Sequence, residues 1–160
     1  MSVGVLSAYM VLDFTDERGE IGPMLMGDLG ADVIRVETPN GSEARRAPPF
    51  LETNETDLRS LQFLAFNRNK RSICLDPSSD ADKAILAALI ARTDFIVESG
   101  QQLESTWGTS FDDAKALNPH LVHVRITAFG SDGPYAEMKA ADLTIVSMAG
   151  PVALQGVPGR

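Results

Sequence analysis

The fold is decided by residues 11–37, which read VLDFTDERGEIGPMLMGDLGADVIRVE. Three of the first four residues are apolar, as in a buried strand, and a second apolar segment follows at residues 32–37. Between these segments Gly22 and Pro23 open a helix, because a proline in the first turn gives up no hydrogen bond, and Gly30 ends it. The order strand, helix, strand predicts two parallel strands joined by a crossover helix.

The alternation of strands and helices continues along the rest of the chain. Further strands are expected at residues 71–75, 95–97 and 121–126, and further helices at residues 79–92, 110–118 and 142–149. Residues 40–62 are polar and contain prolines, which predicts a long surface loop. Short apolar strands between helices indicate an α/β fold with a Rossmann-like parallel sheet and helices on both faces. In such a sheet, ligands bind beyond the carboxyl ends of the strands.

The composition narrows the class of protein. The chain has 160 residues, 44% of them hydrophobic, and a formal net charge of −8, which predicts a soluble globular domain. Its acidity argues against nucleic acid and against anionic membranes as partners. No apolar run is long enough to span a bilayer and no secretory pattern is recognised, so a cytoplasmic location is expected.

The single cysteine, Cys74, rules out an intrachain disulfide, and we expect it to be a buried thiol.

Three cations stand within four positions just before the third expected strand: Arg68, Lys70 and Arg71. In an acidic chain this concentration indicates either a site for a specific anion or a solvated loop. A dinucleotide fingerprint, a P-loop and a nucleophile elbow are absent from the sequence. His120 and His123 lack further converging ligands, so a metal site is not expected. The residues alone therefore indicate an α/β domain that binds an anion.

The order of several short motifs adds a resemblance. They are Val11–Thr15, Gly22-Pro23, Asp28–Glu37, Phe66–Ile73, Asp94–Glu98, Leu117–Pro119 and Phe129-Gly130 with Gly133–Tyr135. Seven motifs in this order resemble the class III CoA-transferase family, which includes formyl-CoA transferase, carnitine CoA-transferase and α-methylacyl-CoA racemase. The resemblance covers nearly the whole chain.

The resemblance implies the N-terminal part of a Rossmann-like large domain. Residues 1–150 would be a portion of the CoA-binding domain, and residues 151–160 would begin a segment that leads to the catalytic region. Acyl-CoA and a carboxylic acid are the implied substrates, with no tightly bound cofactor or metal, and the implied assembly is an interlocked homodimer. The implied nucleophile is an aspartate that attacks the thioester. We expect it after the turn that residues 157–159 begin, beyond Arg160, so we expect no catalytic residue and no turnover in these 160 residues alone.

The family's CoA-binding positions carry over unevenly. They fall on Glu20, Ile21, Leu75, Asp76, Ser99, Gly100, Lys139 and Asp142, and Arg71 is a further candidate that would steer phosphate. Two family arginines are replaced by Thr38 and Thr106, which weakens phosphate binding unless Arg45, Arg46 or Arg71 compensates. The racemase branch has a histidine where this chain has Ala141, and α-proton exchange then lacks one of its two bases.

Two other interpretations remain open from the sequence. The first is a non-catalytic CoA-binding or interaction domain that has kept the fold and lost the chemistry. The second is a receiver-type signalling module, for which Asp16, Glu17 and Asp76 supply acidic residues after the first and third strands. The long segment at residues 40–62 fits the receiver interpretation poorly.

Overall fold

The computed structural model describes residues 4–51 and 59–155. The chain divides into two compact units, the sheet unit (Met1–Ile126) and the terminal unit (Thr127–Arg160). This division does not coincide with the expected boundary at residue 150, so the assignment of 1–150 to a CoA-binding portion stays a prediction. The turn expected at residues 157–159 lies outside the described residues.

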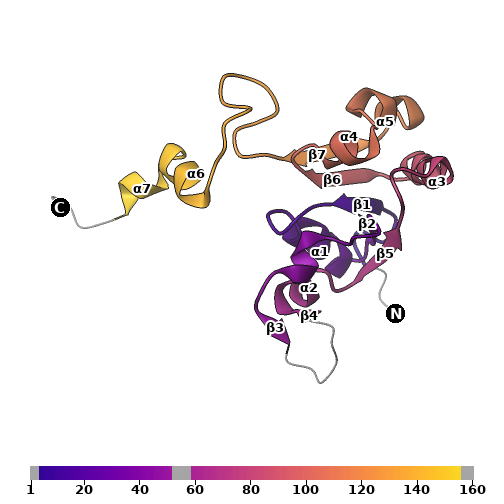
Figure 1. Cartoon of the computed structure of the whole chain (residues 1–160), viewed down its shortest axis with the longest axis horizontal. Helices are drawn as coiled ribbons and strands as arrows, with labels where there is room; N and C mark the ends of the chain where they lie inside the picture. Colours follow the sequence, from indigo (N-terminus) through magenta and orange to yellow (C-terminus); the bar gives the residue numbers. More distant parts are fainter. Residues whose placement is uncertain (1–3, 52–58, 156–160) are drawn as a thin grey trace. The chain divides into compact units, whose positions relative to one another are not determined.

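Five parallel strands form the main sheet of the sheet unit (Figure 1). Their order in space is β5 (Lys70–Cys74), β2 (Asp32–Glu37), β1 (Met10–Phe14), β6 (Phe95–Ser99) and β7 (Val122–Ile126). Counted along the chain this order is 3-2-1-4-5, as in the first five strands of a doubly wound fold. The predicted parallel sheet is confirmed, with β1 at its centre.

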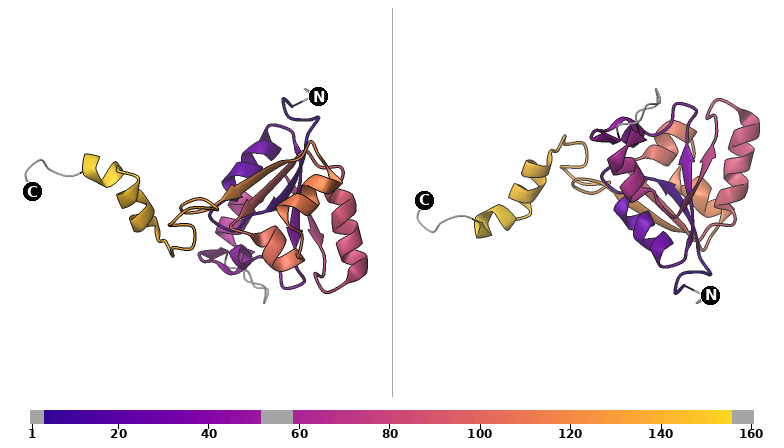
Figure 2. Two further views of the ribbon diagram at one scale, coloured as in Figure 1. Left: turned by 90° about the horizontal axis from the view of Figure 1, so that it is seen from above. Right: turned by 90° about the horizontal axis from the view of Figure 1, so that it is seen from below.

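Helices cover both faces of this sheet (Figure 2). On one face, α1 (Ile21–Asp28) contributes Met26 to a cluster of Val11, Val33 and Val97. The other face carries α3 (Asp80–Ile90), α4 (Gln102–Trp107) and α5 (Phe111–Leu117), which bury Leu86, Leu103 and Ala114 against Leu12, Ile34 and Ile96. Neighbouring strand residues therefore belong to opposite clusters, as the two-residue period of a strand requires.

The segment expected to be a loop contains more structure than predicted. It holds the 3-10 helix η1 (Glu43–Arg46) and the short pair β3 (Phe50–Leu51) and β4 (Arg59–Ser60), and α2 (Leu61–Phe66) follows. Ser42 and Ser60 start the two helical elements, since each hydroxyl accepts a backbone N–H of the first turn. Helix α4 was also not predicted. No serine or aspartate caps its first turn, and the Leu103 N–H in that turn donates instead to Glu98 of β6.

Cys74 is exposed, so the expectation of a buried thiol is wrong. It is the last residue of β5, which lies at the edge of the sheet beside β2 in the described part of the chain. The apolar neighbours Ile73 and Leu75 favoured a buried side chain, whereas an edge strand leaves part of its surface uncovered.

The terminal unit contains α6 (Asp142–Met148) and α7 (Pro151–Leu154). The helix expected at residues 142–149 is thus present, while Pro151 begins α7 instead of only ending the preceding helix. Before α6, the rings of Phe129 and Tyr135 lie 6.2 Å apart. Among the described residues, no helix has the length and apolar character needed to cross a membrane.

Glu98 joins three elements on the α3 side of the sheet. Its fully buried carboxylate accepts hydrogen bonds from the Leu103 N–H of α4 and from Nε of Arg125, each at 2.8 Å, and lies 2.8 Å from Nε2 of His123. Burial alone would raise the pKa of Glu98, but the hydrogen bonds from His123, Leu103 and Arg125 outweigh it and hold the pKa below its usual value.

We expect Glu98→Gln to lower the free energy of unfolding at pH 7 by about 3 kcal/mol, because it removes the buried negative charge and leaves the largely buried Arg125 guanidinium without its carboxylate. A lowered folded-state pKa stabilises the protein above the unfolded pKa of about 4.3, and this contribution disappears as the pH falls through the folded value. The variant should therefore lose less stability than the parent between pH 5 and pH 3 in urea titrations. Asp112→Asn, at an exposed carboxylate of α5, is the control. Equal acid sensitivity of the parent and Glu98→Gln would contradict this role.

Candidate functional site

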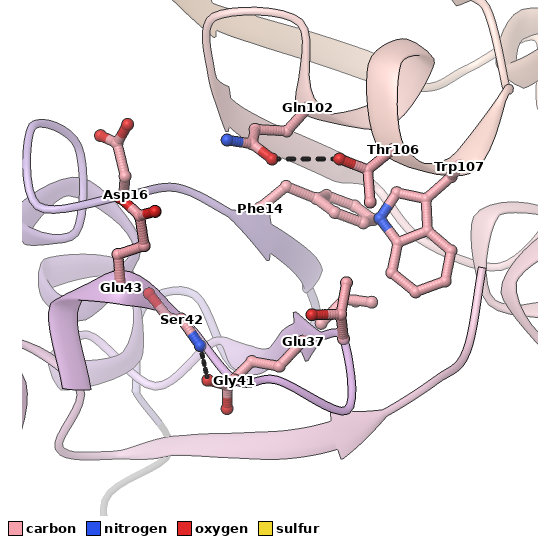
Figure 3. A pocket seen from close by; sticks show the side chains of 11 residues that line it. Phe14, Asp16, Glu37, Gly41, Ser42, Glu43, Gln102, Thr106 and Trp107 are labelled. Atoms are coloured by element: carbon pink, nitrogen blue, oxygen red, sulfur yellow. Dashed lines mark hydrogen bonds between the residues drawn. The ribbon is translucent and has the colours of Figure 1, made fainter. Parts of the chain in front are cut away.

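A pocket of about 270 Å³ lies at the carboxyl ends of β1 and β2, beside α4. Its apolar lining consists of Phe14, Val36 and Trp107, which are buried. The rest of its lining is Asp16, Glu37, Thr38, Gly41, Ser42, Glu43, Gln102 and Thr106. In Figure 3, Gln102, Thr106 and Trp107 of α4 face the residues that follow β1 and β2 across the pocket. All eleven belong to the sheet unit.

Glu37, the last residue of β2, organises the wall opposite α4. Its carboxylate accepts bonds from Nε and Nη2 of Arg45 at 2.7 and 2.6 Å, from the Ser42 N–H at 3.0 Å and from the Ser72 hydroxyl at 2.9 Å. Burial alone would raise the pKa of Glu37, but these bonds lower it to about 2. Glu37 therefore stays ionised, and the Arg45 guanidinium is committed to it.

Asp16 fixes the loop after β1. Its backbone N–H donates to the Ser99 hydroxyl of β6 at 3.1 Å, and its carboxylate pairs with Arg18. Burial alone would raise the pKa of Asp16, whereas its bonds to Arg18 and Ser99 lower it. The loop carries a negative charge to the pocket edge.

On the α1 side of the sheet lies a cluster of four buried charged side chains and one half-buried amide, the buried charge cluster: Asp13, Glu20, Arg35, Lys70 and Asn67. The guanidinium of Arg35 contacts Oδ2 of Asp13 at 3.3 Å, Oε1 of Glu20 at 3.0 Å and Oδ1 of Asn67 at 3.0 Å. The Lys70 ammonium donates to Oδ2 of Asp13 at 2.7 Å and to Oδ1 of Asn67 at 3.0 Å. Two carboxylates are thus balanced by two cations.

The buried charge cluster also holds the pocket in place. Nη2 of Arg35 donates to the Thr15 carbonyl at 3.0 Å and to the Ser42 hydroxyl at 2.8 Å, which ties the loops after β1 and β2 to the sheet. Burial lowers the pKa of Lys70, against the pull of Asp13. Two buried atoms, Oε2 of Glu20 and Nε of Arg35, have no hydrogen-bond partner among the described residues.

The cationic run, Arg68 to Arg71, was predicted to bind an anion, but its three cations form ion pairs with carboxylates of this chain. Arg68 pairs with Asp28 at 2.7 Å and Arg71 with Asp32 at 2.8 Å, and Lys70 belongs to the buried charge cluster. Arg71 lies near the amino end of β5, whereas the pocket opens at the carboxyl ends of the strands. These pairs favour a structural role for the run, and the CoA contact of Arg71 stays a prediction.

Four predicted CoA contacts do lie at the carboxyl edge of the sheet, although none lines the pocket. Leu75 is part of the core, and Asp76 accepts bonds from the N–H and hydroxyl of Ser78, which lower its pKa. The buried Ser99 is bonded to the loop after β1, and Gly100 turns with φ +68°.

The other predicted contacts are dispersed. Glu20 is buried in the charge cluster, and Ile21 at the start of α1 is exposed. Lys139 and Asp142 are exposed residues of the terminal unit. Their roles as CoA contacts remain predictions.

The pocket residues that sequence reasoning missed come from the ends of β1 and β2, from the segment after β2 and from α4. In α4 the resemblance points to Thr106, whereas Gln102 and Trp107 were not predicted. The signal for α4 was the four-residue spacing of Leu103 and Trp107, both buried on one side of the helix. Thr38 and Thr106, where the resemblance expects arginines, both line the pocket.

Comparisons with known proteins all point to CoA-transferases. A family model described as CoA-transferase family III matches residues 6–160. A formyl-CoA:oxalate CoA-transferase of Streptomyces coelicolor is 36% identical over 158 residues, covering 98% of this chain and 37% of the relative. A succinate–glutarate CoA-transferase of Agrobacterium fabrum is 34% identical over 138 residues, which is 84% of this chain and 34% of the relative. The chain thus spans little more than a third of these relatives.

Two solved protein structures are also similar to this chain. A CAIB/BAIF family protein from Brucella suis superimposes with a TM-score of 0.85 at 34% identity, covering 99% of this chain and 43% of that one. Rv3272 of Mycobacterium tuberculosis, in its orthorhombic form, gives a TM-score of 0.80 at 29% identity, covering 99% of this chain and 44% of that one.

We expect Arg35→Met to lower the free energy of unfolding by about 3–5 kcal/mol, because two buried carboxylates would keep only Lys70 as a cation. Arg68→Met removes the same side chain from an exposed pair and should cost less than about 1 kcal/mol. Urea denaturation at pH 7 measures both variants. Similar losses of unfolding free energy in the two variants would show that the buried charge cluster stabilises the fold no more than an exposed ion pair does.

Proposed function

Because the chain belongs to CoA-transferase family III, we propose that its residues supply the nucleotide-binding part of an enzyme that transfers CoA between carboxylic acids. The observation that carries this proposal is the family match over residues 6–160, together with a pocket at the carboxyl ends of the strands. That edge is where parallel α/β sheets bind ligands. The relatives named above act on formyl-CoA and oxalate and on succinate and glutarate, which supports two carboxylic acids as the exchange partners.

The pocket suits the end of CoA that does not react. In a transfer between carboxylates, the thioester is the reacting group and the nucleotide lies far from it along the same molecule. Binding energy from such a remote part positions the reacting group and lowers the barrier. We propose that Phe14 and Trp107 give the pocket its apolar walls, while Ser42, Gln102 and Thr106 supply polar contacts.

We propose that Ser99, one of the expected contacts, acts on the pocket indirectly through the pocket residue Asp16. Ser99 and Asp16 hold two strand ends together beside the pocket, so they act on its shape. We propose no catalytic residue within the described part of the chain, and the interlocked homodimer implied by the resemblance stays a prediction.

We expect the 160-residue chain to bind CoA, and Gln102→Trp to weaken that binding at least tenfold because the indole fills the pocket. Gln101→Trp is the matched control, since Gln101 is the exposed neighbour that does not line the pocket. Isothermal titration calorimetry with CoA measures both, and circular dichroism checks that both variants keep their fold.

Equal weakening by the two tryptophans, or none by either, would place the nucleotide outside this pocket. A folded chain without measurable CoA affinity would overturn the proposal and favour a domain that has kept the fold for another interaction.

A further inference from the structure

The pocket is unusual for a site that receives a phosphorylated ligand. Of the described residues that line it, three carry carboxylates, Asp16, Glu37 and Glu43, and none is a lysine or an arginine. A phosphate usually meets arginines, lysines or free backbone N–H groups. The charge inside the pocket therefore favours a neutral group over an anion.

Two arginines, Arg45 and Arg18, already bind carboxylates that line the pocket. Arg45 uses Nε and Nη2 on the carboxylate of Glu37, and this contact raises the pKa of Arg45 further. Its guanidinium also lies over the ring of Phe63, 4.0 Å from the centroid, which holds it in place. Arg18 is paired with Asp16 in the same way. A phosphate that bonded to either guanidinium would lie close to the carboxylate that the same guanidinium already binds.

In the first turn of α4, one backbone N–H that could bind an anion is already used. The Leu103 N–H donates to the buried Glu98 carboxylate at 2.8 Å. A negative charge thus already occupies the end of the helix where a phosphate would otherwise be favoured.

The lining does suit a nucleoside. Phe14 and Trp107 are large aromatic side chains, and Ser42, Thr38 and Thr106 are hydroxyl groups that pair with a ribose or a base. Glu43, in η1 after the second strand, has an exposed carboxylate that can accept hydrogen bonds from free ribose hydroxyls, the role that an acidic residue has in dinucleotide-binding folds. At about 270 Å³ the pocket is smaller than the roughly 300–1,000 Å³ of most ligand sites, so it takes one part of a large ligand.

We propose that this pocket selects a nucleoside whose ribose carries no phosphate, so that the chain binds dephospho-CoA at least as tightly as CoA. Thr38 and Glu43 are the residues that set this preference: Thr38 supplies no positive charge, and Glu43 supplies a negative one. The inference rests on the proposed function, because it assumes that the pocket receives the nucleotide end of a CoA-type carrier.

The test compares the dissociation constants of CoA and dephospho-CoA for the full 160-residue chain by calorimetry at constant ionic strength. The unmodified chain should bind dephospho-CoA with equal or higher affinity. Thr38→Arg should shift the ratio of the two constants about tenfold toward CoA, the effect of one charge-assisted hydrogen bond. Glu43→Gln should shift it in the same direction by a smaller factor.

Ala88→Arg is the control for total charge, because it adds the same charge at an exposed position of α3 and should leave the ratio unchanged. A tenfold preference of the unmodified chain for CoA would overturn the inference and leave the proposed function standing. The inference also fails if Thr38→Arg and Ala88→Arg shift the ratio equally. Absence of binding for both ligands overturns the proposed function, and the inference falls with it.

Discussion

The rest of the sheet unit depends on the ion pairs and hydrogen bonds of the buried Arg35 guanidinium. A charge placed away from water is costly unless its partners satisfy it, and here they come from β1, from the loops after β1 and β2, and from the residues before β5. Because each of these segments supplies a partner, none can move without taking a hydrogen bond from the buried guanidinium. The position of the pocket is thus fixed by an electrostatic requirement as well as by apolar packing.

The same requirement explains why the cationic run was hard to interpret from sequence. Lys70 and Arg71 find their partners 57 and 39 positions earlier in the chain, at Asp13 and Asp32. Local sequence shows a concentration of positive charge and does not show which acid lies across the sheet. The sheet itself was predictable, because its strands are short apolar segments and the helices between them carry recognisable start and stop residues, such as the capping box of Ser110 and Asp113.

The candidate site was predictable only in its location. The general rule for parallel sheets indicates the correct edge, and the resemblance points to Thr38 and Thr106, both of which line the pocket. The remaining walls depend on α4 and η1. Helix α4 is capped by a glutamate from the preceding strand, and η1 is a single short turn. Such elements are stabilised by tertiary contacts more than by their own sequence, so their periodicity is a weak signal: in α4 it consists of Leu103 and Trp107 alone.

The strand order has a consequence for how the chain is made. β1, at the centre of the sheet, pairs with β2 on one side and with β6 on the other, and Val11 is aligned with Phe95, 84 positions later. At the usual synthesis rate of about 5–20 residues per second, β6 is completed about 4–17 seconds after β1. During that interval one edge of β1, the most apolar strand, has no strand paired with it. A ribosome that slows between α3 and β6 lengthens the wait, so codon choice there would affect the yield of folded protein while leaving the amino-acid sequence unchanged.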